Sequence, residues 1–150
     1  MHFCTSAASA IYPSRTFRAW LGYGAEFPAA GGGMGFVQSP LGYMRTDGVI
    51  VANDWFDLVA GFDVKLRAAI DHDEYGVPID PPTSVWSNVT WDGRPGGAAS
   101  SQFANCNGWS DRRALGAYGD ATQRNREWTV AGGGGGVSCE SQLRLYCFEQ

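Results

Sequence analysis

Four cysteines constrain this chain more than any other feature, because two of them lie close to its ends. They are Cys4, Cys106, Cys139 and Cys147 in a chain of 150 residues. An even number of widely spaced cysteines is typical of two disulfides formed in an oxidising compartment. Spacing alone leaves three pairings open, and four buried free thiols in a cytosolic protein are the alternative. No CxxC spacing occurs, so neither a zinc nor a thioredoxin-type site is indicated.

The segment between the last two cysteines has the alternation of a β-strand. Leu143, Leu145 and Cys147 alternate with Arg144 and Tyr146, and a period of two places neighbouring side chains on opposite faces. We therefore expect Leu143 and Leu145 to face the core. A strand this close to the end of the chain needs an anchor, which Cys147 can provide.

Glycine, proline and charge limit the class of protein. Twenty-one Gly and seven Pro predict tight turns and irregular loops instead of long helices. The formal net charge of −4 argues against nucleic acid as a partner. No apolar run approaches membrane-spanning length, so no membrane insertion is expected. All cations but one are Arg, the side chain that favours planar, bidentate contacts.

The first half of the chain is expected to hold the helices and a hairpin. In chain order we predict the end of a helix over 4–10, a strand over 17–21, a loop over 22–42, a hairpin over 43–52, a helix over 53–62, a short strand over 66–70 and a polar loop over 71–82. Asp47-Gly48 supplies the positive φ of a two-residue hairpin turn. Asn53 or Asp54 can cap the helix, and Gly61 can end it.

Strands dominate the second half. We expect them over 85–91, 126–130 and 142–148, separated by loops over 92–102 and 107–126. The glycine run 132–136 precedes neither GK[ST] nor a helix, so we interpret it as a tight backbone crossing and not a phosphate loop. With no internal repeat or second domain boundary, residues 1–150 are predicted to form one α+β domain. Its sheet is irregular and mostly antiparallel, with one or two short helices and long loops.

Three segments in a fixed order carry a resemblance to a known family. They are FRAWL, then SPLGYMRTDGVIVANDWFDLVAG, and last VW…DGR…NCNGW…G…W…SCESQLRLYCFE. Together they resemble the endostatin-like domains, which are C-terminal modules of certain collagens with bacterial relatives and adopt a C-type-lectin-like fold. The resemblance spans Cys4 to Glu149, and the C-terminal segment is its specific part.

The resemblance implies a disulfide pairing and an origin. It pairs Cys4 with Cys147 and Cys106 with Cys139. In the chain-entropy model, closing the outer loop from Cys4 to Cys147 would stabilise the folded chain by about 4–5 kcal/mol. Closing the inner loop from Cys106 to Cys139 would stabilise it by about 3–4 kcal/mol. The chain begins MHFC, almost at a cysteine. We therefore expect Met1 to have been added to the C-terminal fragment of a longer protein, with its export signal upstream.

Metal chemistry is not expected. C-type lectins that bind sugar through calcium use Glu-Pro-Asn and Trp-Asn-Asp motifs, whereas this chain reads WDGRPGG and EWTVAGGGGGVSC, so too few oxygen ligands converge. His2 and His72 are too few for the histidine-rich zinc site of mammalian endostatins. The densest carboxylate cluster, Asp71, Asp73 and Glu74, is interpreted as a solvated polar loop. We expect no metal and no cofactor.

Catalysis is also not expected. His72, flanked by Asp71 and Asp73, is the single candidate base. No GxSxG or comparable nucleophile motif accompanies it, and nothing indicates the paired carboxylates of a glycosidase. We therefore expect no enzyme, and a hydrolase centred on His72 is the least favoured alternative.

Recognition residues gather between Trp86 and Trp128. Arg forks hold carboxylate or sulfate groups, and aromatic rings stack on sugars or aliphatic chains. The candidate ligand-binding residues are Trp91, Asp92, Arg94, Asp111, Arg112, Arg113, Tyr118, Asp120, Arg124 and Arg126. A solvated face is the alternative for the arginines, and Trp109 and Trp128 are expected in the core. The glycosylation sequon at Asn88 lies inside an expected strand, so we discount it.

These features favour an extracellular or cell-surface recognition module without enzymatic activity. It would be the terminal adhesive domain of a surface or secreted protein and would bind a glycan or protein on another cell or matrix. Heparin binding through arginine clusters is what the endostatin resemblance implies. The alternative is a structural cap of a fibre or stalk that forms a homotrimer through upstream sequence.

Overall fold

The fold was analysed in a computed structural model, which describes residues 3–30, 35–60, 65–95, 105–132 and 135–150. The helices are α1 (Phe3–Ala8), α2 (Trp55–Leu58), α3 (Cys106–Trp109) and the 3₁₀ helix η3 (Arg126–Trp128). The strands are β1 (Phe17–Ala19), β2 (Tyr43–Met44), β3 (Ile50–Ala52), β4 (Ser84–Trp86), β5 (Leu115–Asp120), β6 (Gly136–Ser138), β7 (Arg144–Leu145) and β8 (Cys147–Glu149). The expected helix end at Gly61 and part of the glycine run lie outside the described residues.

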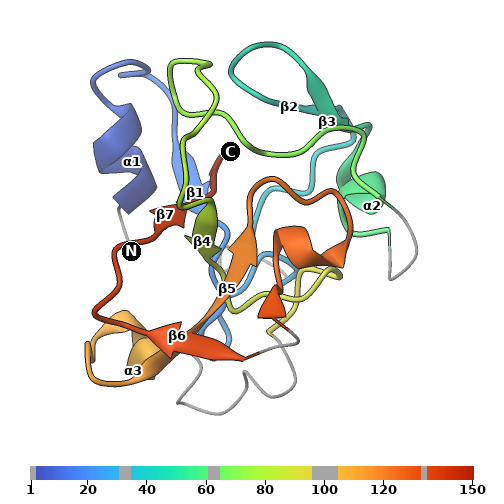
Figure 1. The fold of residues 1–150 in the computed structure, drawn as a ribbon. Coiled ribbons are helices and arrows are strands. Elements are labelled where there is room, and N and C mark those ends of the chain that lie inside the picture. Colours follow the sequence, from blue (N-terminus) through green and yellow to red (C-terminus); the bar gives the residue numbers. More distant parts are fainter. Residues whose placement is uncertain (1–2, 31–34, 61–64, 96–104, 133–134) are drawn as a thin grey trace.

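Small sheets, and not one broad sheet, organise the described residues. The largest has the order β6-β5-β4-β7, in which β7 runs parallel to β4 and the other pairs are antiparallel. The first strand, β1, pairs with the last, β8, and β2 pairs with β3. Figure 1 shows β5 at the centre, with β4 and β6 beside it. The predicted α+β class, with short helices and mostly antiparallel pairing, is confirmed.

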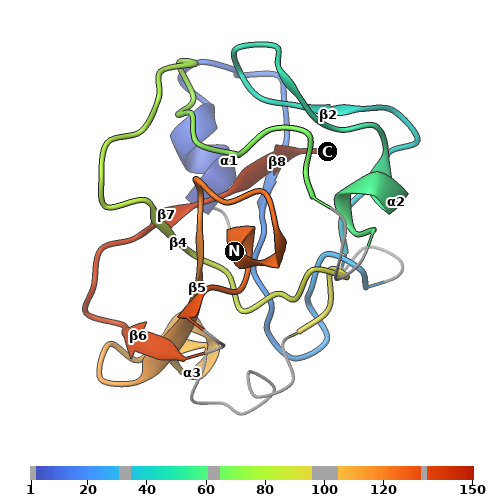
Figure 2. The same cartoon turned by 45° about the vertical axis from the view of Figure 1, so that its right-hand side comes forward.

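Two disulfides join the pairs that the resemblance implied. Cys4 bonds Cys147, 143 positions along the chain, and Cys106 bonds Cys139, 33 positions along. The outer disulfide ties α1 to β8, and Figure 2 shows these two elements side by side near the C-terminus. The inner disulfide ties α3 to the residue that follows β6. Both ends of the chain are thus anchored, as expected for Cys147.

Trp20 is the centre of an aromatic core. Its side chain is fully buried, and its ring contacts Phe36, Trp55, Trp128 and Phe148 at centroid distances of 4.9–6.2 Å. These rings come from loops and from α2, η3 and β8, so one cluster holds segments far apart in sequence. Aromatic contacts of this kind add to the stabilisation from burial. Trp128 therefore lies in the core, as predicted.

A buried hydrogen-bond network lies beside this core. The Trp20 indole N–H donates to the Thr129 hydroxyl at 2.8 Å, and that hydroxyl donates to the Val89 carbonyl at 2.6 Å. The Ser87 hydroxyl lies 2.7 Å from the Thr129 hydroxyl. Buried polar groups need such partners. The network therefore attaches the chain to the core at two places, just after Trp86 and just after Trp128.

The strand expected over 85–91 ends at Trp86, which corrects the prediction. Asn88 has a φ of 56°, in the left-handed region that a strand cannot contain. Its side-chain amide donates to the Gly22 carbonyl at 2.8 Å, and the residue is 1% exposed. Burial, and not a strand, therefore keeps the sequon at Asn88 from accepting a glycan in the folded chain.

The predictions for 107–126 and 126–130 were wrong. The expected loop contains β5, the central strand of the largest sheet. The expected strand begins with η3, because the Asn125 side chain accepts the Glu127 N–H and caps a helical turn.

The expected strand over 66–70 is also absent. There the Leu66 N–H donates to the Arg124 carbonyl, and the Arg124 side chain donates to the Leu66 carbonyl. The Arg67 N–H donates to the Val51 carbonyl, so the segment contacts two other parts of the chain without forming a regular strand pair.

The hairpin and the helix after it differ in length from the prediction. Gly48 has the expected positive φ of 86°, but the Arg45 N–H donates to the Val49 carbonyl, so residues 46–48 form a loop longer than the predicted two residues. Asp54 caps α2 by accepting the Asp57 N–H at 2.8 Å. The helix ends at Leu58 because Val59 leaves the helical backbone region.

The C-terminal strand is interrupted at Tyr146, which reverses the expected faces. Tyr146 is 4% exposed, and its hydroxyl donates to the Trp128 carbonyl at 2.8 Å. Burial raises the pKa of this hydroxyl well above its ordinary value. Leu143 and Leu145 are only half-buried. The larger ring fills the core, so the two leucines face a surface pocket.

No described helix has both the length and the apolar composition needed to cross a membrane.

Candidate functional site

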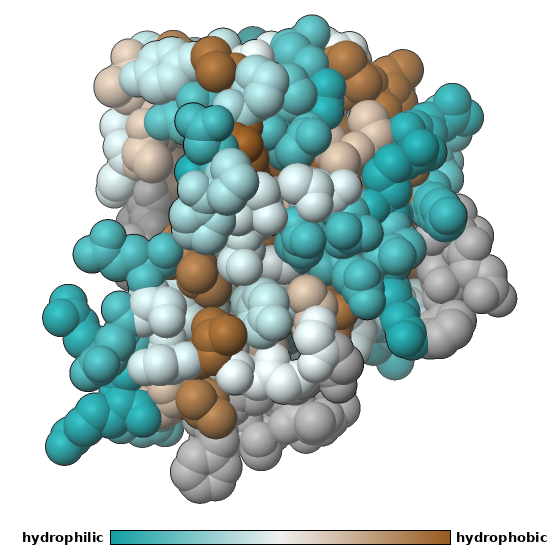
Figure 3. Space-filling view, viewed as in Figure 1, coloured by the Kyte–Doolittle hydropathy of each residue, from teal (hydrophilic) through white to brown (hydrophobic). Residues whose placement is uncertain are grey.

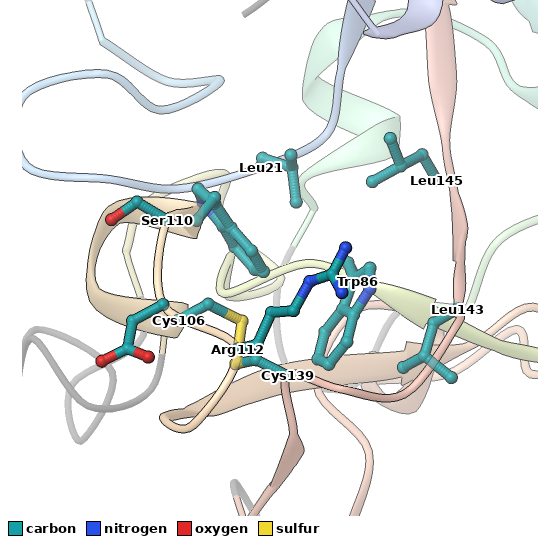
Figure 4. Close-up of a pocket in the computed structure, with 10 residues that line it drawn as sticks. Leu21, Trp86, Cys106, Ser110, Arg112, Cys139, Leu143 and Leu145 are labelled. Carbon is teal, nitrogen blue, oxygen red and sulfur yellow. A yellow bond between two sulfur atoms is a disulfide. The ribbon is translucent and has the colours of Figure 1, made fainter.

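A pocket of about 330 Å³ opens between α3, β4 and β7. Its lining residues are Leu21, Trp86, Cys106, Trp109, Ser110, Asp111, Arg112, Cys139, Leu143 and Leu145. Figure 4 shows Leu21, Leu145 and Leu143 along the upper and right-hand sides and the Cys106–Cys139 disulfide at the lower left. Figure 3 shows apolar residues in a column over β7 and β6, flanked by hydrophilic ones. The walls are therefore mainly apolar and lie within an otherwise polar face.

Two tryptophans form the aromatic part of the pocket. Trp86 ends β4 and Trp109 ends α3, and their rings meet edge to face with centroids 5.8 Å apart. A side chain on Gly116 of β5 would place its Cβ 2.6 Å from the Trp86 ring and 2.8 Å from Cys106 Sγ. Glycine at this position therefore lets both the ring and the disulfide lie against the strand. Trp109 is half-buried and lines the surface pocket, which corrects its expected place in the core.

An unusual backbone positions Trp109. Cys106, Asn107 and Trp109 have φ values of 52°, 50° and 62°, which non-glycine residues rarely adopt. The Asn105 side chain accepts the Gly108 N–H at 3.1 Å, and the inner disulfide holds Cys106. Such conformations persist where surrounding contacts enforce them, and they are frequent at functional sites. The Trp109 indole nitrogen is buried without a hydrogen-bond partner in the described structure, so packing alone orients this ring.

Charged side chains stand at the rim of the pocket. The Asp111 carboxylate accepts the Arg113 N–H at 2.9 Å and lies 3.8 Å from its guanidinium, whose side chain is 90% exposed. Arg112 is exposed and has no hydrogen bond or ion pair with any residue that the structure describes. Figure 4 shows its side chain extending across the pocket toward Trp86. Within the part of the chain that the structure describes, the Arg112 guanidinium at the rim is therefore open to a ligand.

The structure brings together only part of the predicted site. Asp111 and Arg112 line the pocket, and Arg113 stands beside them through its pairing with Asp111. Tyr118 of β5 lies directly opposite Trp86 of β4 in the sheet, so the two share one face. Of these four residues, Asp111 and Arg112 line the pocket, and Arg113 and Tyr118 each neighbour a residue that lines it.

A second group of predicted residues forms a separate turn after β4. Asp92 accepts the Thr90 hydroxyl and, at 3.3 Å, the Arg94 N–H. The Arg94 guanidinium lies 4.0 Å from the Asp92 carboxylate and is 73% exposed. Trp91 is half-buried in the same turn. None of these residues lines the pocket.

The remaining predicted residues have structural partners. Arg124 donates to the Leu66 carbonyl at 2.7 Å, and Arg126 lies on η3. Asp120 accepts hydrogen bonds from the hydroxyls of Thr83 and Thr122. Burial acts to raise the pKa of Asp120, but the hydrogen bond from the Thr122 N–H, together with these hydroxyls and the Gln123 side chain, outweighs burial, and the pKa lies below its ordinary value. Asp120 thus stabilises the turn after β5 through these hydrogen bonds.

Residue patterns missed most of the pocket wall. Trp86, Leu21, Leu143 and Leu145 were not among the predicted site residues, because apolar side chains in strands are usually core. One signal was available for Trp86: it directly follows Val85 in an expected strand, so their side chains lie on opposite faces and cannot both point inward. No sequence signal separated Leu143 from a core residue.

The candidate base His72 lies in a cluster of charged side chains and is not among the residues that line the pocket. Its Nδ1 lies 2.8 Å from Asp71 and its Nε2 3.5 Å from Asp47. Arg45 pairs with both carboxylates, at 2.5 Å and 2.7 Å. Its hydrogen bond is the main cause that holds the pKa of Asp47 below its ordinary value. These contacts join the hairpin to loop 71–82.

No three His, Cys, Asp or Glu side chains of the described residues are placed to hold a metal ion. Comparison with models of known protein families and with curated protein sequences gives no match. The site is therefore defined by its geometry: an aromatic pocket framed by a disulfide, with a charged rim.

Proposed function

We propose that the chain is an extracellular recognition module without enzymatic activity. It binds a glycan or protein ligand, without calcium, through the pocket beside Trp86 and Trp109. The observation that carries this proposal is the exposed apolar pocket with the Arg112 guanidinium at its rim, which has no partner among the described residues. Ligand sites combine apolar walls with a few well-placed polar groups in this way. The two disulfides support an oxidising, extracellular setting.

We also propose that residues 1–150 form a single endostatin-like domain with the C-type-lectin-like fold. The pairing of Cys4 with Cys147 and of Cys106 with Cys139 supports this, since the resemblance implied it. The pairing of the first strand with the last supports it too. In this proposal the disulfide-anchored core presents the pocket and its charged rim as the adhesive surface.

The test is binding of the purified chain to a glycan array, to heparin at two salt concentrations and to intact cells. Leu143→Ser and Arg112→Gln should each weaken the binding that the wild-type chain shows, by about threefold or more, because each removes a pocket contact. Arg94→Gln is the matched control, since Arg94 is exposed and lies outside the pocket. No binding to any glycan or cell, or equal binding by all variants, contradicts the proposal.

A structural cap that assembles into a trimer is the second candidate. Large apolar side chains are exposed on and beside the β2–β3 hairpin and α2: Leu41 at 73%, Met44 at 65% and Phe56 at 77%. Figure 3 shows apolar atoms at the upper right, over this hairpin. Contiguous exposed apolar surface is typical of interfaces. A monomeric mass in solution at high concentration counts against assembly through this face.

A further inference from the structure

The walls of the pocket suit an apolar group better than a sugar. Three leucines, two indole rings and a disulfide make up most of the lining. The Ser110 hydroxyl already donates to the Asn107 carbonyl at 2.6 Å, so its proton is not available to a ligand. A sugar ring presents many hydroxyl groups, and burying them without partners is unfavourable. An aromatic or aliphatic side chain needs no such partners.

The volume fits one large side chain. About 330 Å³ is at the low end of the range of about 300–1,000 Å³ for small-molecule sites. Protein interfaces often depend on one or two bulky side chains that fill a pocket of this kind and are surrounded by weaker contacts. The neighbouring arginines and Tyr118 can supply those weaker contacts.

The positive charge of Arg112 at the rim favours a ligand that carries a carboxylate. Arg112 has no partner among the described residues, whereas the neighbouring Arg113 and Asp111 pair with each other. A guanidinium beside an apolar pocket can hold a carboxylate through two parallel hydrogen bonds. The ligand therefore carries an apolar group and a carboxylate close together, as a peptide does when a bulky residue stands beside Asp, Glu or a free C-terminus.

We infer that the pocket binds a segment of a protein partner, with an aromatic or leucine side chain between Trp86 and Trp109 and an adjacent carboxylate on Arg112. This inference rests on the proposed recognition function and selects protein over glycan as the ligand. It also assigns Arg112 a direct ligand contact, with Leu143 and Leu145 as the wall.

The experiment uses three small probes on the intact, oxidised chain: N-acetyl-phenylalanine, its neutral amide, and glucuronate. Binding is followed through the indole N–H signals of Trp86 and Trp109 in NMR titrations. N-acetyl-phenylalanine should give saturable shifts at both signals. Its amide should bind about threefold more weakly, which is the loss expected for one solvent-exposed ion pair. Arg112→Gln should abolish this difference, and the control Arg94→Gln should keep it.

Each outcome separates the inference from the proposed function. Shifts of Trp86 and Trp109 with glucuronate but not with N-acetyl-phenylalanine overturn the inference and leave a glycan-binding module. Equal binding of the acid and its amide, or a difference that survives Arg112→Gln, removes Arg112 from ligand contact and overturns the inference. No shift with any probe, together with no glycan or cell binding, contradicts both.

Discussion

A single carboxylate organises the turn that follows β5. Asp120 accepts the Thr122 N–H at 3.0 Å, the Thr122 hydroxyl at 2.8 Å and the Thr83 hydroxyl at 2.9 Å. The Thr83 contact joins this turn to the residue before β4. The sequence placed Asp120 among candidate ligand residues because its charge is visible there, whereas its partners are not. Only the fold shows that its oxygens are already used.

Asp120→Asn should lower stability in a pH-dependent way. The pKa of Asp120 is lower in the folded chain than its ordinary value, so its ionised form contributes stability above about pH 4. That contribution is lost as the pH falls through the lowered pKa. The variant should be less stable by about 1–2 kcal/mol at about pH 7, with a difference that shrinks in acid. Urea denaturation across this pH range measures it.

Asp80→Asn is the control for this series. Asp80 is exposed and has no partner among the described residues. Its replacement should change stability little at either end of the pH range. A wild-type advantage over Asp120→Asn that stays constant with pH would show that the carboxylate charge is not responsible.

At the scale of elements, β5 explains why sequence patterns failed in the second half of the chain. Its sequence, LGAYGD, has glycine at two of six positions and no regular alternation of apolar residues. Gly116 makes room for Trp86 and the inner disulfide, and Gly119 makes room for the Trp128 carbonyl. Close packing of other elements against the strand demands small residues. Glycine weakens the local preference for a strand. Tertiary contacts with other elements therefore stabilise β5 as a strand.

Gly119→Ala should disrupt the packing of η3 on β5. The added Cβ would lie 2.1 Å from the Trp128 carbonyl oxygen and 2.7 Å from its carbon. Backbone must move to relieve this contact, at a cost of about 2–3 kcal/mol of unfolding free energy. Thermal and urea denaturation measure the loss. Gly42→Ala is the matched control, because its Cβ would lie 3.4 Å from its nearest neighbour, an ordinary contact. If the two variants were equally stable, the close approach of the Trp128 carbonyl to Gly119 would be excluded.

At the scale of the whole molecule, the two disulfides have different roles. The outer disulfide joins α1 to β8, and the β1–β8 pair then holds both ends of the chain together. The inner disulfide lies in the wall of the pocket, against Gly116 of β5. The regular elements are short, so covalent links and the aromatic core around Trp20 supply order that long helices or a broad sheet would otherwise give.

Removing each disulfide should separate these roles. Replacing Cys4 and Cys147 with Ala should lower the free energy of unfolding by about 4–5 kcal/mol, because the linked positions are 143 apart. Replacing Cys106 and Cys139, 33 apart, should lower it by about 3–4 kcal/mol. Denaturation without reductant compares them. Loss of the Cys106–Cys139 disulfide should weaken ligand binding at the pocket more than loss of the Cys4–Cys147 disulfide does, although it lowers stability less. A larger stability loss for the inner pair would contradict this ordering.

Local chemistry in the sequence was enough to determine several features. Cysteine number and spacing indicated two disulfides, Gly48 marked the hairpin, and Asp54 marked the start of α2. These features depend on residues close in sequence or on covalent chemistry. The arginines and aromatics between Trp86 and Trp128 were likewise recognised as a group with potential for binding.

Only the tertiary structure decided which of those residues form a site. Alternation alone could not tell whether Leu143 or Tyr146 faces the core, because both are apolar enough for either place. The choice follows from packing, since Tyr146 completes the core and donates to the Trp128 carbonyl. The leucines are then left on the pocket side, beside Arg112. Contacts between residues far apart in sequence made this selection, and no local pattern encodes them.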